Sequence, residues 1–524
     1  MPCNKMGWIV VFAAALAAAR DACGAAGEWE YTPYRIHIWL ALAPAPGLNT
    51  IVRDEITATI RRRAEVEFRA AWEVSVSEPP PVLAAEMTAD LDRLTVAEIA
   101  QAAEARLNDD KLICVTVDAS PFEMRVRARE LDTHTRLWGP TIEHSVRNPE
   151  QLGATTYACL LDAFAPIARI ELGETRTATV RLRAGGLALE DKSAARISIG
   201  DVLVPILRTN DRFGKPLPDR TAEIPWTLLQ VTGADRTNRN LLSCNVYSGM
   251  RAPLRGKSSG RRERYAVKAR ITRNRTEVKV QVRPLKADQV PVPLAGLEVY
   301  SRVPAPEEPR QQTAEEAKAD EKKNPPEFVG VTDWRGTINI TPAAQSPLRL
   351  VYIKSGDQLL ARLPLAPGRE LEQVAEVPDD GPRLQAEGYI KGLNSELLDL
   401  VSQRQIIALR FRKRLSDKKF DEAQKLLDEL RSLKSRGDIQ RDLDEQMHRQ
   451  IPSPYASVQA RIDKLYSDTR SMLNKYLDSD LPNQLMQELR KARGEIPSTT
   501  PDSPPAKGPA TSRSQWKSGS RQPA

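Results

Sequence analysis

Histidine, cysteine and aromatic residues are scarce in this sequence of 524 residues. It holds four histidines and five cysteines, and Phe, Trp and Tyr together make up 5% of the chain. The spacings His-Glu-x-x-His and Gly-x-Ser-x-Gly do not occur, and six residues separate Gly249 from Gly256 before Lys257, where a phosphate loop has four. The sequence therefore predicts no catalytic residue, no cofactor-binding residue, no metal ligand and no cofactor.

Long apolar runs are also missing after Ala19, and a membrane-spanning helix needs about 20 apolar residues. The one apolar run, Gly7–Ala19, follows Lys5 and leads into further small residues. A basic start, a short apolar core and Ala-rich ends are typical of a secretory signal peptide, with cleavage after Ala19 or Ala26. We therefore expect residues 1–26 to be removed on export. The mature chain, without a transmembrane span, would work in the periplasm, the cell envelope or the extracellular space.

Cysteine is too rare to build a disulfide framework. Loss of the signal peptide removes Cys3 and Cys23 and leaves Cys114, Cys159 and Cys244. Three thiols cannot all pair with one another. One disulfide beside a free thiol stays open as an alternative, but the sequence favours three buried small residues.

Charge of one sign does not dominate the chain either. The 77 Lys and Arg residues exceed the 69 Asp and Glu residues by 8, which is mild for this length and requires no nucleic-acid partner. The chain is too long for one hydrophobic core, so we expect a multidomain α+β protein. Changes in apolar period and composition predict these parts: signal peptide 1–26, α+β domain 30–172, small β-barrel or sandwich 173–290, β-sandwich 291–375, α-helical region 384–494 and disordered tail 497–524.

The first predicted domain mixes strands and helices. Tyr34–Leu42 alternates in polarity as a strand does, and Asn49 is placed to cap a helix whose apolar residues recur as far as Trp72. Further strands are predicted at Glu73–Ser77 and Leu112–Val117, and a helix closes the domain. Helices that return onto a sheet predict an N-terminal α/β sandwich.

Two histidines, His134 and His144, flank a predicted turn at Trp138–Pro140. A two-residue loop would pair apolar side chains across this turn and place the histidines on opposite faces of the hairpin. A three-residue loop would place them opposite each other, where Asp132 could complete a metal site. The apolar pairing favours the first register, so neither histidine is assigned as a metal ligand.

The densest charge cluster lies in the second predicted domain, at residues 251–275, where Glu263 is the one acidic residue among ten basic ones. Part of this cluster falls on a predicted hairpin, residues 264–283, which would place Lys268 and Arg270 on its outer face. Such a stripe could bind an anionic envelope polymer by charge, whereas a solvated sheet face is the simpler alternative. The few aromatic residues argue against single-stranded nucleic acid. The anion-binding residues that this patch predicts are Arg261, Arg262, Arg264, Lys268, Arg270, Arg273 and Arg275.

The third predicted domain contains short strands joined by glycine turns. They are Pro293–Tyr300, Gly330–Ile340, Leu348–Ile353 and Leu359–Leu363. This pattern resembles the carboxypeptidase-regulatory-like, transthyretin-like β-sandwich modules of extracytoplasmic proteins, over about residues 291–370. The resemblance implies a non-catalytic accessory module. The segment 304–326 departs from the pattern, because its Pro, Glu, Lys and Ala residues predict a mobile loop.

The apolar period becomes helical from about Leu384. Apolar stripes at helical spacing run over Leu393–Phe411, Phe420–Leu433, Val458–Leu477 and Leu485–Ala492. Phe420-x-x-Ala423-x-x-Leu426 is similar to part of a tetratricopeptide-type helix pair, but a solenoid needs about three repeats. The stripes therefore predict an α-helical bundle or short coiled-coil region, and their width predicts a protein partner.

These features predict an exported, non-catalytic interaction or scaffold protein of the cell envelope or periplasm. One alternative is an exported hydrolase whose site, formed by scattered carboxylates, lies in residues 30–172. A second alternative is a polyanion-binding module that uses the basic hairpin at residues 251–275.

Overall fold

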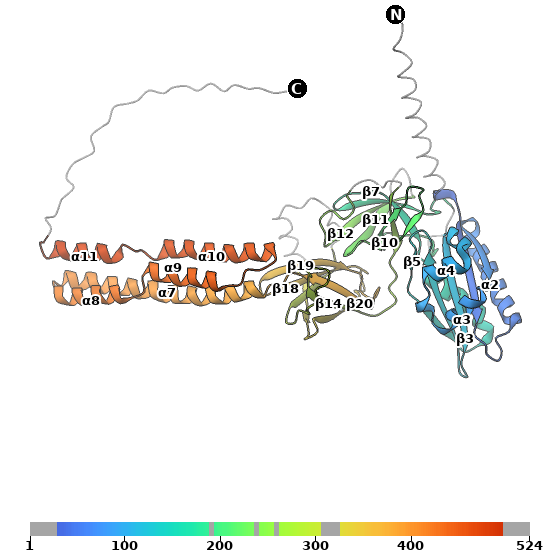
Figure 1. Ribbon diagram of the computed structural model, residues 1–524, viewed down its shortest axis with the longest axis horizontal. Helices are drawn as coiled ribbons and strands as arrows, with labels where there is room; N and C mark the ends of the chain where they lie inside the picture. Colours follow the sequence, from blue (N-terminus) through green and yellow to red (C-terminus); the bar gives the residue numbers. More distant parts are fainter. Residues whose placement is uncertain (1–28, 188–192, 235–239, 256–260, 305–324, 496–524) are drawn as a thin grey trace, which may run out of the picture. The chain divides into compact units, whose positions relative to one another are not determined.

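A mixed sheet with helices on both faces forms the N-terminal part of the protein in a computed structural model (Figure 1). The structure describes residues 29–187, 193–234, 240–255, 261–304 and 325–495. The predicted signal peptide, the predicted tail and most of the predicted loop 304–326 lie outside these residues. The chain divides into two units, one that ends at Val377 and one that begins at Pro378. Among the described residues, no helix is both long enough and apolar enough to cross a membrane.

The first module of the N-terminal unit has a sheet of order β2-β1-β3-β4, with β5 and β6 both paired to β4. β1 is parallel to β2 and β3, and β4 is antiparallel to β3. Its elements are β1 (Tyr34–Leu42), α2 (Thr50–Phe68), β2 (Trp72–Ser77), α3 (Pro81–Ala89), α4 (Val96–Ala103), β3 (Lys111–Ala119), β4 (Met124–Asp132), β5 (Leu137–Trp138), β6 (Ile142–Val146) and α5 (Leu152–Ala163).

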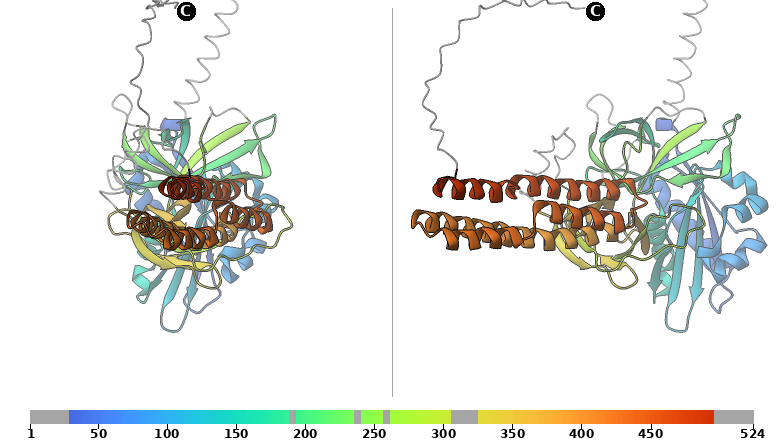
Figure 2. Two further views of the ribbon diagram at one scale, coloured as in Figure 1. Left: turned by 90° about the vertical axis from the view of Figure 1, so that its left-hand side faces the viewer. Right: turned by 60° about the vertical axis from the view of Figure 1, so that its left-hand side comes forward.

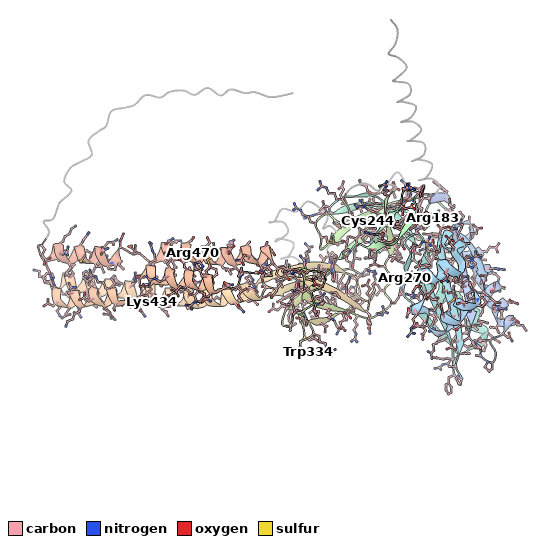
Figure 3. All side chains as sticks on the ribbon, in the orientation of Figure 1. Arg183, Cys244, Arg270, Trp334, Lys434 and Arg470 are labelled. Carbon is pink, nitrogen blue, oxygen red and sulfur yellow. The ribbon has the colours of Figure 1, made fainter. Side chains whose placement is uncertain are left out.

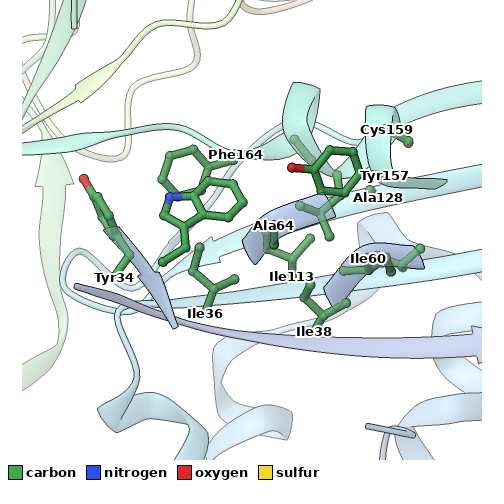
Figure 4. Packing of buried hydrophobic residues seen from close by; sticks show 14 of the residues in the cluster. Tyr34, Ile36, Ile38, Ile60, Ala64, Ile113, Ala128, Tyr157, Cys159 and Phe164 are labelled. Carbon is green, nitrogen blue, oxygen red and sulfur yellow. The ribbon is translucent and has the colours of Figure 1, made fainter. Parts of the chain in front are cut away.

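Alternation along β1 builds a core on each face of this sheet. Ile36 and Ile38 pack with α2 and α5, as Figure 4 shows, whereas Trp39 packs with α3 and α4 on the other face. Asn49 caps α2 by accepting a hydrogen bond from the Val52 amide at 3.1 Å. The predicted strand 34–42 and the predicted helix cap are therefore confirmed, and the mixed α and β character of the module is as expected.

The predicted turn at Trp138–Pro140 is wrong. The chain turns between Asp132 and Leu137, which pair directly with each other. An Asp132 carboxylate oxygen accepts the Thr135 amide at 2.7 Å, and Arg136 has a φ of 58°, so local hydrogen bonding and backbone conformation tighten the turn earlier than the apolar pattern indicated. Neither predicted histidine register exists in this hairpin.

A six-stranded barrel follows, in which the strand order β9-β11-β12-β8-β7-β13 closes because β13 also pairs with β9. β10 extends the sheet beside β9. The strands are β7 (Ile167–Gly173), β8 (Thr177–Leu182), β9 (Val202–Asn210), β10 (Pro216–Glu223), β11 (Thr227–Ala234), β12 (Leu241–Ser248) and β13 (Arg262–Lys268). Among the described strands of the barrel, closure leaves only β10 as an edge, and it buries an apolar interior that includes Leu203, Leu229 and Val231.

The third module has two sheets, β17-β14-β20 and β16-β15-β18-β19. Its strands are β14 (Thr276–Val282), β15 (Glu298–Arg302), β16 (Glu327–Val331), β17 (Thr337–Ile340), β18 (Arg349–Ser355), β19 (Gln358–Leu365) and β20 (Glu372–Val377). Side chains of both sheets meet in one core, with Val280 from β14 and Ile353 from β18 among them. Gly336, at φ 73°, closes the turn before β17, where a Cβ atom would lie 2.4 Å from the Val280 carbonyl oxygen.

The predicted hairpin at Arg264–Arg283 is wrong, because its two halves belong to different modules. β13 pairs with β7 and β9 in the barrel, whereas β14 pairs with β17 and β20 in the third module. The connector between them is tied to the third module, since the amides of Thr272 and Arg273 both donate to the Gly368 carbonyl oxygen. Alternation correctly indicated two strands, but it did not specify their partners.

The C-terminal unit is helical, with α7 (Gly381–Ser416), α8 (Phe420–Ser432), α9 (Arg436–Arg449), α10 (Ala456–Tyr476) and α11 (Leu481–Ala492). α7 runs the length of the unit, while α8 with α9 and α10 with α11 form two further rows beside it (Figure 2). One half of α7 shares a core with α9 and α10, and the other half shares a core with α8 and α11. The predicted C-terminal helices are confirmed.

Candidate functional site

A charged cleft of about 390 Å³ opens where the first module, the barrel and the third module meet. Arg129 on β4 and Gly139 after β5 line it from the first module. Lys268 at the end of β13, Arg270 in the connector and Arg369 before β20 line it from the other two modules. Figure 3 labels Arg270 at this junction. All three modules of the N-terminal unit therefore contribute to one site.

Arg129 lies on β4 with its side chain 14% exposed. Its Nε donates to the Gly139 carbonyl oxygen at 3.2 Å, and its Nη1 donates to the Leu91 carbonyl oxygen at 2.7 Å. The guanidinium carbon lies 4.8 Å from the centre of a Trp138 ring, a cation–π distance. The nearest carboxylate is that of Asp92, 3.7 Å from Nε. Neutral groups, rather than a close acid, therefore hold this cation in the wall of the cleft.

Arg270 reaches the same point from the connector after β13, with its side chain 13% exposed. Its Nη2 lies 3.4 Å from a Glu130 carboxylate oxygen, and its Nη1 donates to the Asp162 carbonyl oxygen at 3.4 Å. A Cβ atom at Gly139 would lie 2.8 Å from Nη2 of Arg270. The absence of a side chain at position 139 thus lets this guanidinium approach the backbone that also accepts from Arg129.

A fully buried lysine, Lys111, lies behind the cleft. Its Nζ donates to Glu130 at 2.9 Å, to Asp132 at 2.6 Å and to the Ala165 carbonyl oxygen at 2.7 Å. Burial alone would lower the pKa of Lys111, but the two carboxylates outweigh it and raise that pKa. Burial likewise pushes the pKa of Asp132 upward, but Lys111 outweighs it and holds that pKa below its ordinary value. Lys111 and Asp132 are therefore both charged at neutral pH.

A second buried network joins the first module to the barrel through Asp110. One Asp110 oxygen lies 2.7 Å from His134 Nε2 and the other lies 3.1 Å from Arg183 Nη2. Burial raises the pKa of Asp110, but the hydrogen bonds from His134 and Arg183 outweigh it and hold that pKa well below its ordinary value. His144 lies instead beside Asp162, at 3.0 Å. His134 and His144, which flank one predicted turn in the sequence, therefore have separate carboxylate partners in the structure.

The predicted anion patch does not lie on one face. Lys268 lies 2.8 Å from an Asp201 carboxylate oxygen, Arg264 donates to the carbonyl oxygens of Leu254 and Arg255, and Arg270 is largely buried. The structure brings Lys268, Arg270 and Arg273 to the cleft, whereas four other members of the patch do not line it: Arg261, Arg262, Arg264 and Arg275. The hairpin on which the polyanion alternative depended is not formed.

Sequence reasoning missed Arg129 and Gly139. The signal was present, because Arg125, Arg127 and Arg129 alternate with the buried residues Val126 and Ala128 along β4. This period places the arginines on one face of the sheet. The pattern does not show which segment approaches this face. That segment is the connector after β13, which carries Arg270 and lies more than a hundred residues later in the chain.

The three thiols of the described chain are free and buried. Burial raises the pKa of Cys114, Cys159 and Cys244 to about 12 in each case. The predicted buried state is confirmed, and the alternative of a disulfide among these three is wrong. Among the residues described, no group of three or more His, Cys, Asp or Glu side chains is placed to hold a metal ion.

A second hollow, of about 420 Å³, lies within the first module, where the hydrolase alternative would place its site. It lies at the ends of β1 and β3, the edge at which open α/β sheets commonly bind ligands. Exposed Phe122 and the neighbouring Met124 give it an apolar wall, and Glu55, Glu123 and Glu150 also line it. The wall that contains these acids is formed mainly by loops, and the described lining of the hollow includes no histidine.

No protein-family model and no curated protein match the chain. Two solved structures are similar to parts of it. The lipoprotein GNA1162 from Neisseria meningitidis is 16% identical, with 24% of this chain and 94% of that chain covered, at a TM-score of 0.15. TolB from Acinetobacter baumannii is 12% identical, with 66% of this chain and 95% of that chain covered, at a TM-score of 0.17. Both scores are too low to support an argument about fold or function.

Proposed function

We propose that this chain is an exported, non-catalytic interaction or scaffold protein of the cell envelope or periplasm, which docks a protein partner through its helical unit. The N-terminal sequence supports export. The folded modules would serve as a scaffold for the docking helix and would perform no reaction themselves. The carboxypeptidase-regulatory-like, transthyretin-like identity of the third module belongs to this proposal, and the seven strands in two sheets support it.

The observation that carries the proposal is a second apolar face on α7. Leu397 and Phe411 are buried in the cores of the helical unit, as the stripe requires. Leu398, Ile406 and Leu409 are instead 69%, 48% and 66% exposed. Helical spacing places Leu398 and Leu409 close to one line on the helix surface. α7 therefore carries more apolar surface than the described core of its own unit covers, which is typical of a protein-docking face.

Site-specific crosslinking in the producing cell tests this docking face. A photoreactive residue at position 398 should capture a partner protein from the envelope, and the same residue at exposed Gln403, on another face of α7, should not. Leu398→Glu and Leu409→Glu should abolish capture by the full chain, whereas Gln403→Glu controls for the added charge. Equal capture from both positions, or capture that survives both leucine substitutions, would contradict the proposal.

Two further observations separate this proposal from its rivals. The mature N-terminus, determined by mass spectrometry of the protein from its native cell, should begin after Ala19 or Ala26. An unprocessed chain in the cytoplasm would contradict export. Turnover of peptides or glycans that is lost on Glu55→Gln would instead favour the hydrolase alternative.

A further inference from the structure

We propose that the cleft between the three modules binds a carboxylate group between the guanidinium groups of Arg129 and Arg270, beside Gly139. This site is independent of the docking face on α7. It differs from the predicted anion patch, because it takes one residue from that patch and combines it with an arginine from the first module. The described chain leaves both of these largely buried cations short of close hydrogen-bond partners.

The Arg270 guanidinium has five N–H donors, but few acceptor atoms lie near it. Its contacts to Glu130 and to the Asp162 carbonyl oxygen are both 3.4 Å long, beyond the usual length for a charge-assisted hydrogen bond. The described part of the chain gives its Nε no hydrogen-bond partner. A guanidinium that is largely buried normally has close partners, because the loss of hydration is otherwise uncompensated.

Arg129 has the same deficiency on the other side of Gly139. Its Nε and Nη1 donate to carbonyl oxygens, but within the described residues Nη2 makes no hydrogen bond. The Asp92 carboxylate is 3.7 Å away and is mostly exposed to solvent. Both arginines thus line the cleft with donors still available, and both guanidinium groups lie against the Gly139 backbone.

The charge balance behind the cleft also favours an anion. Three cations, Lys111, Arg129 and Arg270, are largely buried there against two buried acids, Glu130 and Asp132. Lys111 already forms ion pairs with both acids, its Nζ lying 2.9 Å from Glu130 and 2.6 Å from Asp132. Burial lowers the pKa of Arg129 and of Arg270, so the acids around them do not make up for lost hydration. One added negative charge would balance the cluster.

A carboxylate fits this place better than a phosphate. Asp92, Glu223 and Glu370 also line the cleft, and their carboxylates would repel a dianion more strongly than a monoanion. Glu223 and Glu370 both pair with Arg369, and Arg273 also lines the cleft, so these four side chains together carry no net charge. The planar guanidinium group matches a carboxylate in two parallel hydrogen bonds. A volume of about 390 Å³ holds the end of a peptide or a small organic acid.

Titration calorimetry on the full chain tests the site. The probes are acetate, an acetylated tripeptide with a free C-terminal carboxylate, the same tripeptide as its C-terminal amide, and inorganic phosphate. We expect the free tripeptide to bind and the amide not to bind. Binding of acetate as well would identify a small organic acid as a sufficient ligand, whereas binding of the tripeptide alone would identify a peptide end.

Three substitutions locate the binding. Arg129→Gln and Arg270→Gln should each weaken the tripeptide at least about tenfold, because each removes charge-assisted hydrogen bonds. Gly139→Ala should also weaken it, since the added methyl group displaces the Arg270 guanidinium without removing a charge. Exposed Arg275→Gln, outside the cleft, is the matched control and should leave the affinity unchanged.

Four results would overturn the proposal, and three of them concern affinities. They are unchanged affinity in Arg129→Gln and Gly139→Ala, equal affinity for the tripeptide and its amide, and binding of phosphate without binding of either carboxylate. Absence of binding by any probe at millimolar concentration would also overturn it. Gly139→Ala keeps the test decisive even where loss of a buried arginine unfolds the module, because it changes only the position of a flexible side-chain end.

Discussion

Replacing Lys111 with methionine would remove the cation that neutralises two buried carboxylates. Lys111 is fully buried, and its Nζ lies 2.9 Å from Glu130 and 2.6 Å from Asp132. Methionine keeps most of the volume but removes the close cation from both buried acids, leaving Arg270 at 3.4 Å from Glu130 as the remaining neighbouring cation. Removing one partner of a buried ion pair costs about 3–5 kcal/mol, because the remaining charge is uncompensated. We expect a loss of that size in the free energy of unfolding at pH 7.

The pH dependence of this loss tests its cause. In the natural protein the pKa of Asp132 is lower in the folded than in the unfolded chain, so its stabilising contribution is present above about pH 4 and is lost as the pH falls further. Without Lys111, the strongest lowering influence on that pKa is lost, so we expect the pKa of Asp132 to rise. The deficit of Lys111→Met should therefore be largest at neutral pH and should shrink as the pH falls toward about 4, where Asp132 binds a proton.

Urea unfolding measured by tryptophan fluorescence provides the assay, since Trp39 and Trp72 are buried in the first module. Lys268→Met is the matched control. Lys268 pairs with Asp201 at 2.8 Å, but a third of its side chain is exposed, so we expect a loss of about 1 kcal/mol or less. A loss below about 1 kcal/mol for Lys111→Met, or a loss that does not change with pH, would refute the reasoning.

Three further predictions concern single positions. Gly336→Ala should lower the unfolding midpoint more than Gly296→Ala, because both have positive φ but only position 336 meets a carbonyl oxygen, at 2.4 Å; equal shifts in thermal unfolding would contradict this. Burial lowers the pKa of His37 to about 4, so NMR titration should show its ring neutral until well below pH 6, and its contribution to stability should be lost as the pH falls from about 6.5 toward 4. The three buried thiols, Cys114, Cys159 and Cys244, should react with a thiol reagent only when the chain unfolds. Fast labelling of any of them in the folded chain would contradict the structure.

Local patterns predicted several elements of this fold correctly. The alternation in Tyr34–Leu42 corresponds to β1, and Asn49 caps α2 as its position indicated. The stripe at Phe420–Leu433 corresponds to α8. Each of these features depends on residues within one or two turns or on one strand. The sequence alone therefore contains the physical information that determines them.

Strand partners were much harder to predict. The strands β13 and β14 alternate as a hairpin would, yet they belong to different modules, because alternation reports which face of a strand is buried and not which strand lies beside it. The turn after Asp132 depended on a side-chain hydrogen bond to Thr135 that competes with the apolar pairing considered at Trp138–Pro140. In both cases a local preference was compatible with more than one pairing.

The candidate site shows the same division. Sequence composition alone identified Arg270 as part of a basic segment and identified few residues suited to catalysis. Only the tertiary structure placed Arg270 beside Gly139 and opposite Arg129, and only burial made those two cations short of partners. Helical and strand periods are properties of neighbouring residues, so the chain by itself determined its elements and their buried faces. The cleft depends on contacts between segments more than a hundred residues apart, which the packing of three modules decided.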